Sequence, residues 1–479
     1  MTHLFNKFIS IVTEAHHIDR WDEIIRSNAM IAAAAQLCKE IEDTFPNTSA
    51  LMVGGTVRDL LMGNIHVHDV DIATNAPLEK LEQKYHTHDI GKSKDFGIIT
   101  IKYNNFDFEV ANFRQEEGYS DNRRPDKVSI VNDFEKDSKR RDFTINSMGI
   151  NYKGEISDYN GGVEDIKNRL IRAVGDAKAR FSEDALRLLR AVRFAAKFGF
   201  ELEANTENAI KKLVFSIKNL SPERVRDELF KTAELGGPAL ATYIRKLDAV
   251  GLLEQVLPEV KELQKFHHNP VHHPEGGVFE HVLAAVSKSP SKNPVDNIAV
   301  LLHDLGKATT LGDKNGQPTY YGHEEAGLPI FDKIANRLKI TNKDRKAIEL
   351  SIAKHMHGHN IDKLNDKTIL GLRQNPDWPT LKNTIYSDEA SRLHLFDLKA
   401  FEAKMQKVED VYKKFGDTQA FEARMGELIN GQLIMNVLPE IKGPAIGKIK
   451  NAVRDWIIAQ SFNVTADQVV DMIKQLSNQ

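Results

Sequence analysis

The pattern of apolar residues changes near residue 160, and this change constrains the fold more than any other feature of the sequence. From about residue 163 onward, apolar positions recur every three or four residues, which predicts helices. Before that point, short β-type runs alternate with turns and helical pieces. These runs lie at residues 51–53, 70–72, 98–102 and 106–112. We therefore predict an α+β protein, with a small mixed-sheet head followed by an all-α remainder.

The composition limits the classes of protein to consider. The longest apolar stretch, at residues 30–37, is far shorter than the roughly 18 residues of a membrane span. The single cysteine, Cys38, excludes an intramolecular disulfide and a cysteine-cluster metal site. The amino-terminal segment lacks a signal-peptide pattern, so we expect a cytoplasmic protein without a membrane partner. A net charge of −3 excludes a globally basic coat for nucleic acid but permits a local basic groove.

Asp69 and Asp71 lie in the predicted strand around Val70. Residues two apart in a strand point to the same face, so the two carboxylates would project together. Carboxylates this close repel each other unless a cation neutralises them, and Mg²⁺ is the natural candidate. A solvated strand edge is the commoner explanation of an isolated Asp-x-Asp.

A glycine pair upstream makes the metal site more plausible. Gly54 and Gly55 follow a predicted strand and precede a helical run that contains Arg58. Glycines at such a junction allow backbone N–H groups to approach a phosphate, and an arginine adds a charged fork. The order strand, Gly-Gly, helix and Asp-x-Asp is more specific than any of these features alone. It predicts a site for a metal and a phosphate.

A second group of charged residues lies in the predicted helix over residues 181–194. Asp184, Arg187, Arg190 and Arg193 are three apart, which predicts a stripe on one helix face. An aspartate can accept from an exocyclic amino group while an arginine donates to a ring nitrogen, and cytosine and adenine share this arrangement. A reader formed by Asp184 and Arg187 would accept CTP and ATP and reject GTP and UTP. A solvated basic face is the alternative.

Five motifs, in order, are similar to those of a known family. They are GGTVRD, DVDIAT, RRDFTINSM, DYNGGVEDIKNRLIRAVGDA and EDALRLLRAVRF. Together they resemble the class II tRNA nucleotidyltransferases, which are the CCA-adding enzymes, and the related bacterial poly(A) polymerases. The resemblance covers about residues 51–200. It implies a polymerase-β-like head and the addition of C, C and A to the 3′ end of tRNA from CTP and ATP, with release of pyrophosphate.

The resemblance also implies roles for individual residues. Asp69 and Asp71 would hold the catalytic Mg²⁺, and Glu109 is a candidate third acidic residue. Asp184 and Arg187 would act as the amino-acid template for C and A. The residues implied in binding the nucleotide are Gly54, Gly55, Arg58, Arg141, Arg190 and Arg193.

Two further features of the head follow from the same resemblance. Glu183 would support the template pair. Residues 114–128, with the sequence RQEEGYSDNRRPDKV, resemble the flexible loop with which CCA-adding enzymes switch from C to A.

Histidines are concentrated between residues 267 and 394, where 11 of the 18 lie. His303 and Asp304 are adjacent in an apolar helix, and His281 precedes them. Imidazole and carboxylate groups on neighbouring helices suit a divalent transition metal. For any one of these histidines alone, a surface position or a satisfied core position is the better explanation.

The segment over about residues 270–390 resembles an HD domain, the metal-dependent phosphohydrolase fold. The resemblance implies that His281, His303, Asp304 and Asp388 are metal ligands. His323 and His355 would complete a second metal position or bind a substrate phosphate. In some CCA-adding enzymes such a domain has phosphatase and 2′,3′-cyclic phosphodiesterase activity, and in others it is a degenerate scaffold.

The expected organisation has six parts. They are an N-terminal helical extension (1–30), the nucleotidyltransferase head (31–160), a helical neck (161–225), a helical body (226–270), the HD domain (271–392) and a helical tail (393–479). In the tail, a helix is expected after Gly443, and nearby lysines suit a contact with RNA phosphates.

Several alternatives remain open at this point. A poly(A) polymerase is the nearest rival, and an enzyme that adds only CC or only A is another. In a different class, the HD phosphohydrolase would be the main activity and the head would be an RNA-binding module. The oligomeric state is unknown.

Overall fold

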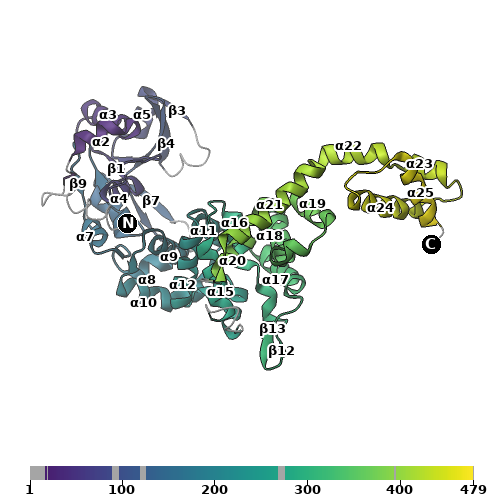
Figure 1. The fold of residues 1–479 in the computed structure, drawn as a ribbon. Coiled ribbons are helices and arrows are strands. Elements are labelled where there is room, and N and C mark those ends of the chain that lie inside the picture. Colours follow the sequence, from purple (N-terminus) through teal and green to yellow (C-terminus); the bar gives the residue numbers. More distant parts are fainter. Residues whose placement is uncertain are drawn as a thin grey trace. The chain divides into compact units, whose positions relative to one another are not determined.

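The computed structural model describes residues 17–18, 20–88, 97–118, 126–267, 276–392 and 395–477. The chain divides into two compact units (Figure 1). Unit 1 comprises Met1–Glu228 and Thr242–Val256, and unit 2 comprises Leu229–Ala241 and Leu257–Gln479. The predicted α+β class is confirmed, because the strands gather in the first part of the chain and helices dominate the rest. The finer division into six parts stays a prediction.

A seven-stranded mixed sheet forms the centre of unit 1, with the strand order β3-β4-β5-β2-β1-β8-β9. Strands β2 and β5 run parallel, and the other neighbouring pairs run antiparallel. Each of the four predicted β-type runs corresponds to a strand. The bounds are β1 (Ala50–Val53), β2 (Asp71–Thr74), β3 (His86–His88), β4 (Ile98–Tyr103), β5 (Phe106–Asn112), β8 (Gly149–Ile150) and β9 (Ile156–Ser157).

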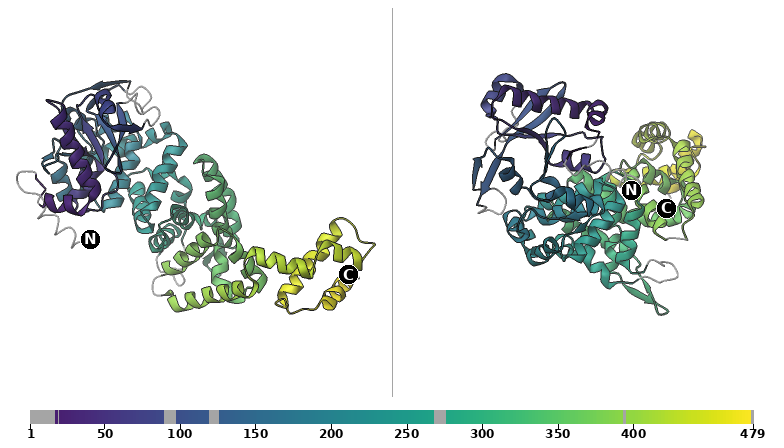
Figure 2. Two further views of the ribbon diagram at one scale, coloured as in Figure 1. Left: turned by 90° about the horizontal axis from the view of Figure 1, so that it is seen from above. Right: turned by 90° about the vertical axis from the view of Figure 1, so that its left-hand side faces the viewer.

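Helix α3 (Ala29–Thr44) packs against β1 and β5 and covers the sheet (Figure 2). Its apolar stripe, which includes Ile31, Leu37 and Ile41, is fully buried. The Asn28 side chain caps the helix by accepting hydrogen bonds from two backbone N–H groups of the first turn. Helix α3 follows α2 (Trp21–Ser27). Residues 1–16 lie outside the described residues, so the helical extension expected over residues 1–30 stays a prediction.

The predicted loop over residues 114–128 begins and ends in a hairpin. Strands β6 (Arg114–Glu117) and β7 (Lys127–Ile130) pair in antiparallel fashion. Residues 119–125, between these strands, lie outside the described residues.

The remaining elements of unit 1 are mostly helical. In α9 the residues Leu188, Leu189 and Val192 are fully buried, which explains the three- and four-residue spacing of its apolar positions. Helix α11 begins in unit 1 and ends in unit 2, and α12 begins in unit 2 and ends in unit 1. The bounds are α4 (Gly55–Leu61), α5 (Leu78–Lys84), α6 (Phe134–Lys139), η2 (Thr144–Asn146), α7 (Gly162–Lys167), β10 (Leu170–Ile171), α8 (Ala177–Glu183), α9 (Leu186–Phe198), β11 (Glu201–Leu202), α10 (Ala204–Leu213), η3 (Val214–Asn219), α11 (Pro222–Glu234), α12 (Gly237–Ala249) and α13 (Leu253–Val256).

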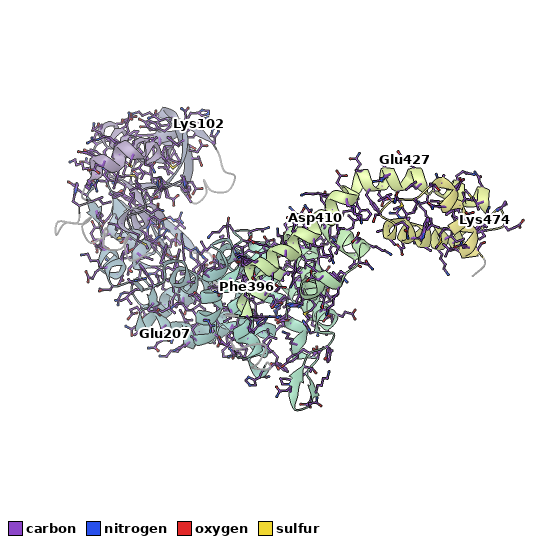
Figure 3. The ribbon with its side chains drawn as sticks, viewed as in Figure 1. Lys102, Glu207, Phe396, Asp410, Glu427 and Lys474 are labelled. Carbon is purple, nitrogen blue, oxygen red and sulfur yellow. The ribbon has the colours of Figure 1, made fainter. Side chains whose placement is uncertain are left out.

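Unit 2 is built on four helices, α15, α16, α18 and α20, which pack against one another. The last helices follow as a series, in which Asp410 lies on α21, Glu427 on α22 and Lys474 on α25 (Figure 3). The expected helix after Gly443 is α24. The bounds are α14 (Pro258–Glu262), η4 (Leu263–Lys265), α15 (Val278–Lys288), α16 (Pro294–Leu302), η5 (Leu305–Ala308), β12 (Gly312–Lys314), β13 (Gln317–Thr319), α17 (His323–Arg337), α18 (Asn342–Lys354), η6 (His355–Lys363), α19 (Asp366–Gln374), α20 (Trp378–Ser391), α21 (Leu398–Phe415), α22 (Thr418–Leu428), α23 (Gly431–Val437), α24 (Pro444–Ala459) and α25 (Ala466–Ser477). Within the described ranges, no helix is both long and apolar enough to span a bilayer.

Candidate functional site

A cavity of about 450 Å³ in unit 1 brings together most of the residues that the sequence predicted for the head. The predicted residues that line it are Gly54, Gly55, Arg58, Asp71, Arg141, Asp184, Arg187 and Arg190. It is also lined by residues that sequence reasoning did not assign, namely Arg140, Asp142, Asn146 and Phe194. The predicted residues Asp69, Glu109, Glu183 and Arg193 do not line it but lie next to residues that do.

The two aspartates do not share one strand, and that expectation is wrong. Strand β2 begins at Asp71, while Asp69 lies in the irregular segment before it. The reason is the length of the neighbouring strand: β1 ends at Val53, which pairs with Asp71, so no partner remains for earlier residues. Asp69 is fixed instead by its carbonyl oxygen, which accepts a hydrogen bond of 3.0 Å from the Thr56 hydroxyl.

Three carboxylates nevertheless interact at this edge of the cavity. Strands β2 and β5 pair Ile72 with Val110, which places Glu109 beside Asp71 on the adjacent strand. Desolvation by the surrounding protein raises the pKa of Asp71 the most, the charges of Asp69 and Glu109 add to this effect, and Arg141 opposes it, so that the pKa is about 6. A site that makes a carboxylate this difficult to ionise favours a cation.

The glycine turn forms one side of the cavity. Gly54 has φ of 69°, a conformation that favours glycine, and a Cβ there would lie 3.5 Å from an Arg141 nitrogen. Arg58 is only 5% exposed. Its guanidinium donates to Asp59 and, at 2.6 Å, to the Asn146 side-chain oxygen. Arg58 therefore also fixes the wall of the cavity.

The charged stripe that was predicted to lie on one helix begins outside that helix, at Asp184. Asp184 has extended backbone angles and lies between α8 and α9, where its carboxylate accepts a hydrogen bond of 3.0 Å from the N–H of Leu186, the first residue of α9. Both carboxylate oxygens of Asp184 also accept from one Arg224 nitrogen, at 3.0 and 2.8 Å. Sequence reasoning missed Arg224, since no local pattern indicates a partner 40 residues away.

Arg187 is held from several directions on the first turns of α9. Glu183 accepts from it at 2.6 Å and also from Arg180 at 2.8 Å. The Arg140 backbone oxygen accepts from both Arg187 and Arg180, at 3.3 Å each. The supporting role expected for Glu183 is therefore consistent with its contacts.

The other two arginines of α9 have carboxylate partners that were not predicted. Arg190 donates to Asp142 at 2.6 and 2.9 Å, and these contacts hold the pKa of the buried Asp142 below its usual value despite its burial. Arg193 donates to Glu228 at 2.6 Å. Asp142 lies in the basic motif RRDFTINSM, which was the one available signal for it.

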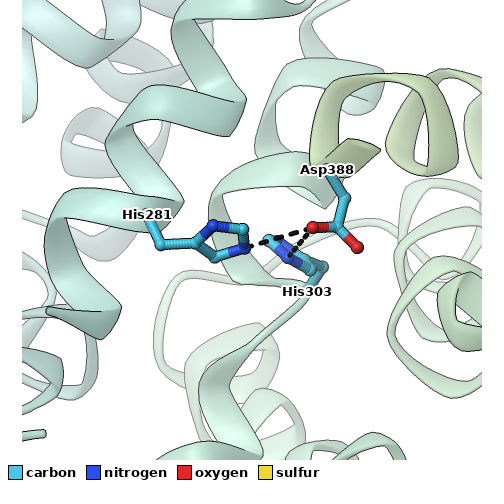
Figure 4. Close-up of side chains that lie close together, drawn as sticks. All are labelled: His281, His303 and Asp388. Atoms are coloured by element: carbon cyan, nitrogen blue, oxygen red, sulfur yellow. Dashed lines mark ion pairs between the residues drawn. The ribbon is translucent and has the colours of Figure 1, made fainter. Parts of the chain in front are cut away.

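Unit 2 contains a separate cluster of buried histidines and aspartates. Nε2 of His281 lies 3.1 Å from an Asp388 oxygen, and Nε2 of His303 lies 4.0 Å from the same oxygen (Figure 4). These three side chains form one group of potential metal ligands with all ligand atoms within 4.8 Å of one another. His303, Asp304 and His355 form a second such group. The chain therefore brings together His281 of α15, Asp388 of α20, and the pair His303 and Asp304. The expectation that this pair lies in a helix is wrong, because α16 ends at Leu302 and Asp304 has non-helical backbone angles.

The histidine rings are oriented by hydrogen bonds on their outer nitrogens. Nδ1 of His303 lies 2.7 Å from the Val300 carbonyl oxygen, and Nδ1 of His281 lies 3.2 Å from the Ser391 hydroxyl. His323 and His355 likewise direct Nδ1 to backbone carbonyl oxygens and bring their Nε2 atoms to 3.1 Å from each other. This arrangement directs Nε2 inward, as in metal sites whose outer contacts fix the tautomer.

The electrostatics of the cluster favour ionised aspartates. Burial opposes ionisation of Asp304, but His303 and Lys307 outweigh it and hold its pKa well below the usual value. Burial also opposes ionisation of Asp388, which hydrogen bonds from His281 and His359 overcome, so its pKa is lowered as well. Burial lowers the pKa of His355 to about 3, which keeps its ring neutral. Imidazole and carboxylate donors in this state fit a divalent transition metal.

Sequence reasoning missed two members of this cluster. The Lys307 ammonium donates to Asp304 at 2.6 Å. His359 lies 3.0 Å from the second oxygen of Asp388. Both residues stand in the motifs around the predicted ligands, but their spacing gave no reason to choose them over other polar neighbours.

Comparisons with known proteins show what the head and the fold are similar to. Residues 50–172 match the family described as "Poly A polymerase head domain", and residues 199–264 match the "Probable RNA and SrmB- binding site of polymerase A". A CCA-adding enzyme of Lactobacillus helveticus is 48% identical over 186 residues, or 38% of this chain and 45% of the relative. One from Staphylococcus aureus is 40% identical over 203 residues, or 42% of this chain and 50% of the relative. In these alignments the chain spans about half the length of the curated relatives it matches.

Solved structures extend the likeness over most of the chain. The Bacillus stearothermophilus CCA-adding enzyme in complex with CTP has a TM-score of 0.69 and 24% identity, and covers 94% of this chain and 98% of that one. The Thermotoga maritima CCA-adding enzyme complexed with tRNA has a TM-score of 0.57 and 17% identity, over 95% and 98%. At such identities the likeness concerns the fold. The expected resemblance of the head is confirmed, and the HD domain over residues 271–392 stays a prediction.

Proposed function

We propose that the chain is a tRNA nucleotidyltransferase that adds C, C and A to the 3′ end of tRNA from CTP and ATP and releases pyrophosphate. The main observation behind the proposal is that Asp71, the glycine turn, Asp184 and Arg187 line one and the same cavity. The sequence identity to curated CCA-adding enzymes supports the proposal. The cytoplasm as its location, and tRNA, CTP and ATP as its partners, belong to the same proposal.

In the proposed reaction, the tRNA 3′-hydroxyl attacks the α-phosphate in line and pyrophosphate leaves. Asp69 and Asp71, with Glu109 beside them, would hold Mg²⁺, which supplies charge to activate the attacking oxygen and to stabilise the leaving one. Arg190 and Arg193 would bind phosphate oxygens. Fixed donors of this kind stabilise the developing charge without having to reorganise.

Base selection would come from Asp184 and Arg187. Arg224 holds the Asp184 carboxylate in place, so this side chain can accept from the exocyclic amino group of cytosine or adenine. Glu183 and the Arg140 carbonyl hold the Arg187 guanidinium, which donates to the ring nitrogen. Guanine and uracil present the opposite polarity and would be rejected.

The experiment is to offer each nucleoside triphosphate alone, with Mg²⁺, to a tRNA lacking its 3′ end. We expect CTP to extend the primer by two residues, ATP to extend a primer ending in CC by one, and GTP and UTP to give no product. A long A-tail made without CTP would identify a poly(A) polymerase instead. Addition that stops at CC, or that occurs only after CC, would identify a partial enzyme.

We propose a second activity for the cluster in unit 2, a metal-dependent phosphohydrolase of the HD type. His281, His303, Asp304 and Asp388 would hold a divalent transition metal, with His323 and His355 serving a second metal or a substrate phosphate. The four histidine rings oriented by hydrogen bonds, and the burial of the ionised Asp304 and Asp388 among them, support this proposal.

Metal analysis and hydrolysis assays would test the second activity together. We expect the protein to retain Mn²⁺, Co²⁺ or Ni²⁺ in equilibrium dialysis and to hydrolyse a 2′,3′-cyclic phosphate. Asp388→Asn should reduce metal content, whereas His66→Ala, on an exposed histidine of unit 1, is the matched control. Retention of metal by Asp388→Asn would contradict the assignment.

A further inference from the structure

An aromatic ring that the sequence analysis did not assign lies in the wall of the nucleotide cavity. Phe194, on α9, lines the cavity and is 6% exposed. Three guanidinium groups lie over its ring: those of Arg193, Arg190 and Arg58 are 4.5, 5.2 and 5.5 Å from the ring centroid. All three arginines are proposed here to bind the nucleotide.

The ring of Phe194 is itself held by other aromatic side chains. Phe198, one helical turn further on, stacks on it with an interplanar angle of 5° and a centroid separation of 5.9 Å. Phe143 meets it edge-on at 5.7 Å. Arg58 also lies 4.8 Å from the Phe198 centroid, so its guanidinium contacts two stacked rings. Phe194 therefore has little freedom to move.

A ring and a carboxylate position an arginine in different ways. Like charges that gather in one cavity repel each other, and a carboxylate relieves this by cancelling charge. The negative face of an aromatic ring attracts the cation without neutralising it. Contact through the flat face of a guanidinium leaves its N–H edge available to carboxylate or phosphate oxygens. A ring can therefore hold arginines together without adding negative charge to that of their carboxylate partners, Asp59, Asp142 and Glu228.

We propose that Phe194 is a positioning residue for the triphosphate, which holds Arg58, Arg190 and Arg193 together beneath the site where the phosphates bind. This role rests on the proposed nucleotide addition. Arg187 is not among the cations found over this ring in the described residues, and Asp184 is held by Arg224. Phe194 therefore acts on the binding of the phosphates and not on the choice of base.

The test compares three variants of the full-length protein. Phe194→Leu removes the ring, and Phe194→Tyr keeps the ring face. Phe200→Leu is the matched control. Phe200 is also buried, and its ring packs against Phe198 with a centroid separation of 5.7 Å. The cation over the Phe200 ring is Arg169, which does not line the cavity. Calorimetry measures the affinities for CTP, ATP and inorganic tripolyphosphate, and thermal melting measures the stability of each variant.

We expect Phe194→Leu to weaken binding of all three ligands by about tenfold, as the loss of several cation–π contacts implies. Selectivity for CTP over UTP should be unchanged. Phe194→Tyr should retain affinity within about threefold, and Phe200→Leu should retain it despite a lower melting temperature. The proposal is overturned if Phe194→Leu leaves tripolyphosphate affinity unchanged, if Phe200→Leu weakens it equally, or if Phe194→Leu alters base selectivity. A wild-type protein that binds tripolyphosphate but adds no nucleotide would overturn the proposed function alone.

Discussion

Arg224 binds both carboxylate oxygens of Asp184 through one nitrogen, at 3.0 and 2.8 Å. The two residues lie on different elements, since Asp184 precedes α9 and Arg224 lies on α11. The arginine thus fixes the orientation of the proposed base-reading carboxylate before any nucleotide binds.

Loss of Arg224 should therefore reduce base selection. In Arg224→Ala the Asp184 carboxylate is free to turn, and we expect kcat/KM for CTP to fall by about 10–100-fold, because small misplacements of a positioning group cost this much. The advantage of CTP over UTP should fall as well. Single-nucleotide addition kinetics would measure both. The matched control is Arg226→Ala, two residues along the same helix, and an equal loss of selectivity there would count against the account.

Replacement of the metal-binding carboxylates should abolish nucleotide addition. We expect Asp69→Asn with Asp71→Asn to lower kcat by at least ~10³-fold, since metal ions supply several kcal/mol of charge stabilisation in such reactions. Hydrolysis at the cluster in unit 2 should be unaffected. Loss of hydrolysis with retention of nucleotide addition would contradict the account, since it would assign Asp69 and Asp71 to hydrolysis.

The raised pKa of Asp71 gives a prediction on stability and pH. Because its pKa in the folded protein, about 6, exceeds its ordinary value, folding favours the protonated form. The resulting stability is complete below the ordinary pKa and is lost as the pH rises through about 6. In EDTA, Asp71→Asn should raise the melting temperature at about pH 8 and leave it unchanged at about pH 3. Adding Mg²⁺ at the higher pH should stabilise the wild type alone. A lower melting temperature for the variant at about pH 8 would contradict this reasoning.

Substitutions at two glycines, Gly306 and Gly371, would measure how closely the segments around the cluster of buried histidines and aspartates are packed. A Cβ at Gly306 would lie 1.9 Å from the His323 carbonyl oxygen, so alanine must push η5 away from the start of α17. We expect Gly306→Ala to lower the free energy of unfolding by about 1–3 kcal/mol, as overpacking does. Gly371→Ala, in α19, meets nothing within 4 Å and should instead add about 0.4–1 kcal/mol. Denaturant melts would measure both, and equal effects at the two positions would show that the close approach at Gly306 is unimportant.

Local chemistry explains which features could be predicted from the sequence. The glycine turn, the Asp-x-Asp pair and the arginine spacing are short-range patterns. The cavity brings together the glycine turn, Asp71, Arg187 and Arg190, but Asp69 and Arg193 do not line it. The boundaries were less accurate, because β2 begins where β1 provides a partner, at Asp71, and because Asp184 has extended backbone angles and lies before α9 instead of in it. Neither outcome depends on local propensity alone.

The partners that fix the site were mostly beyond prediction. Arg224 and Glu228 reach α9 from another helix, and His359 reaches Asp388 across the cluster, so none has a signature in its own segment. Phe194 could have been read as an ordinary core residue, since its apolar spacing is that of a buried helix face. Arg190 and Arg193 are its neighbours on α9, but the approach of Arg58 from α4 follows only from the tertiary packing.

Sequencing of the products formed on a tRNA lacking its 3′ end, with all four nucleoside triphosphates and Mg²⁺ present, would test the central claim most directly. The account predicts that each extended tRNA gains C, C and A in that order and that extension then stops. Products with a long run of A, products containing G or U, or no extension at all would contradict it.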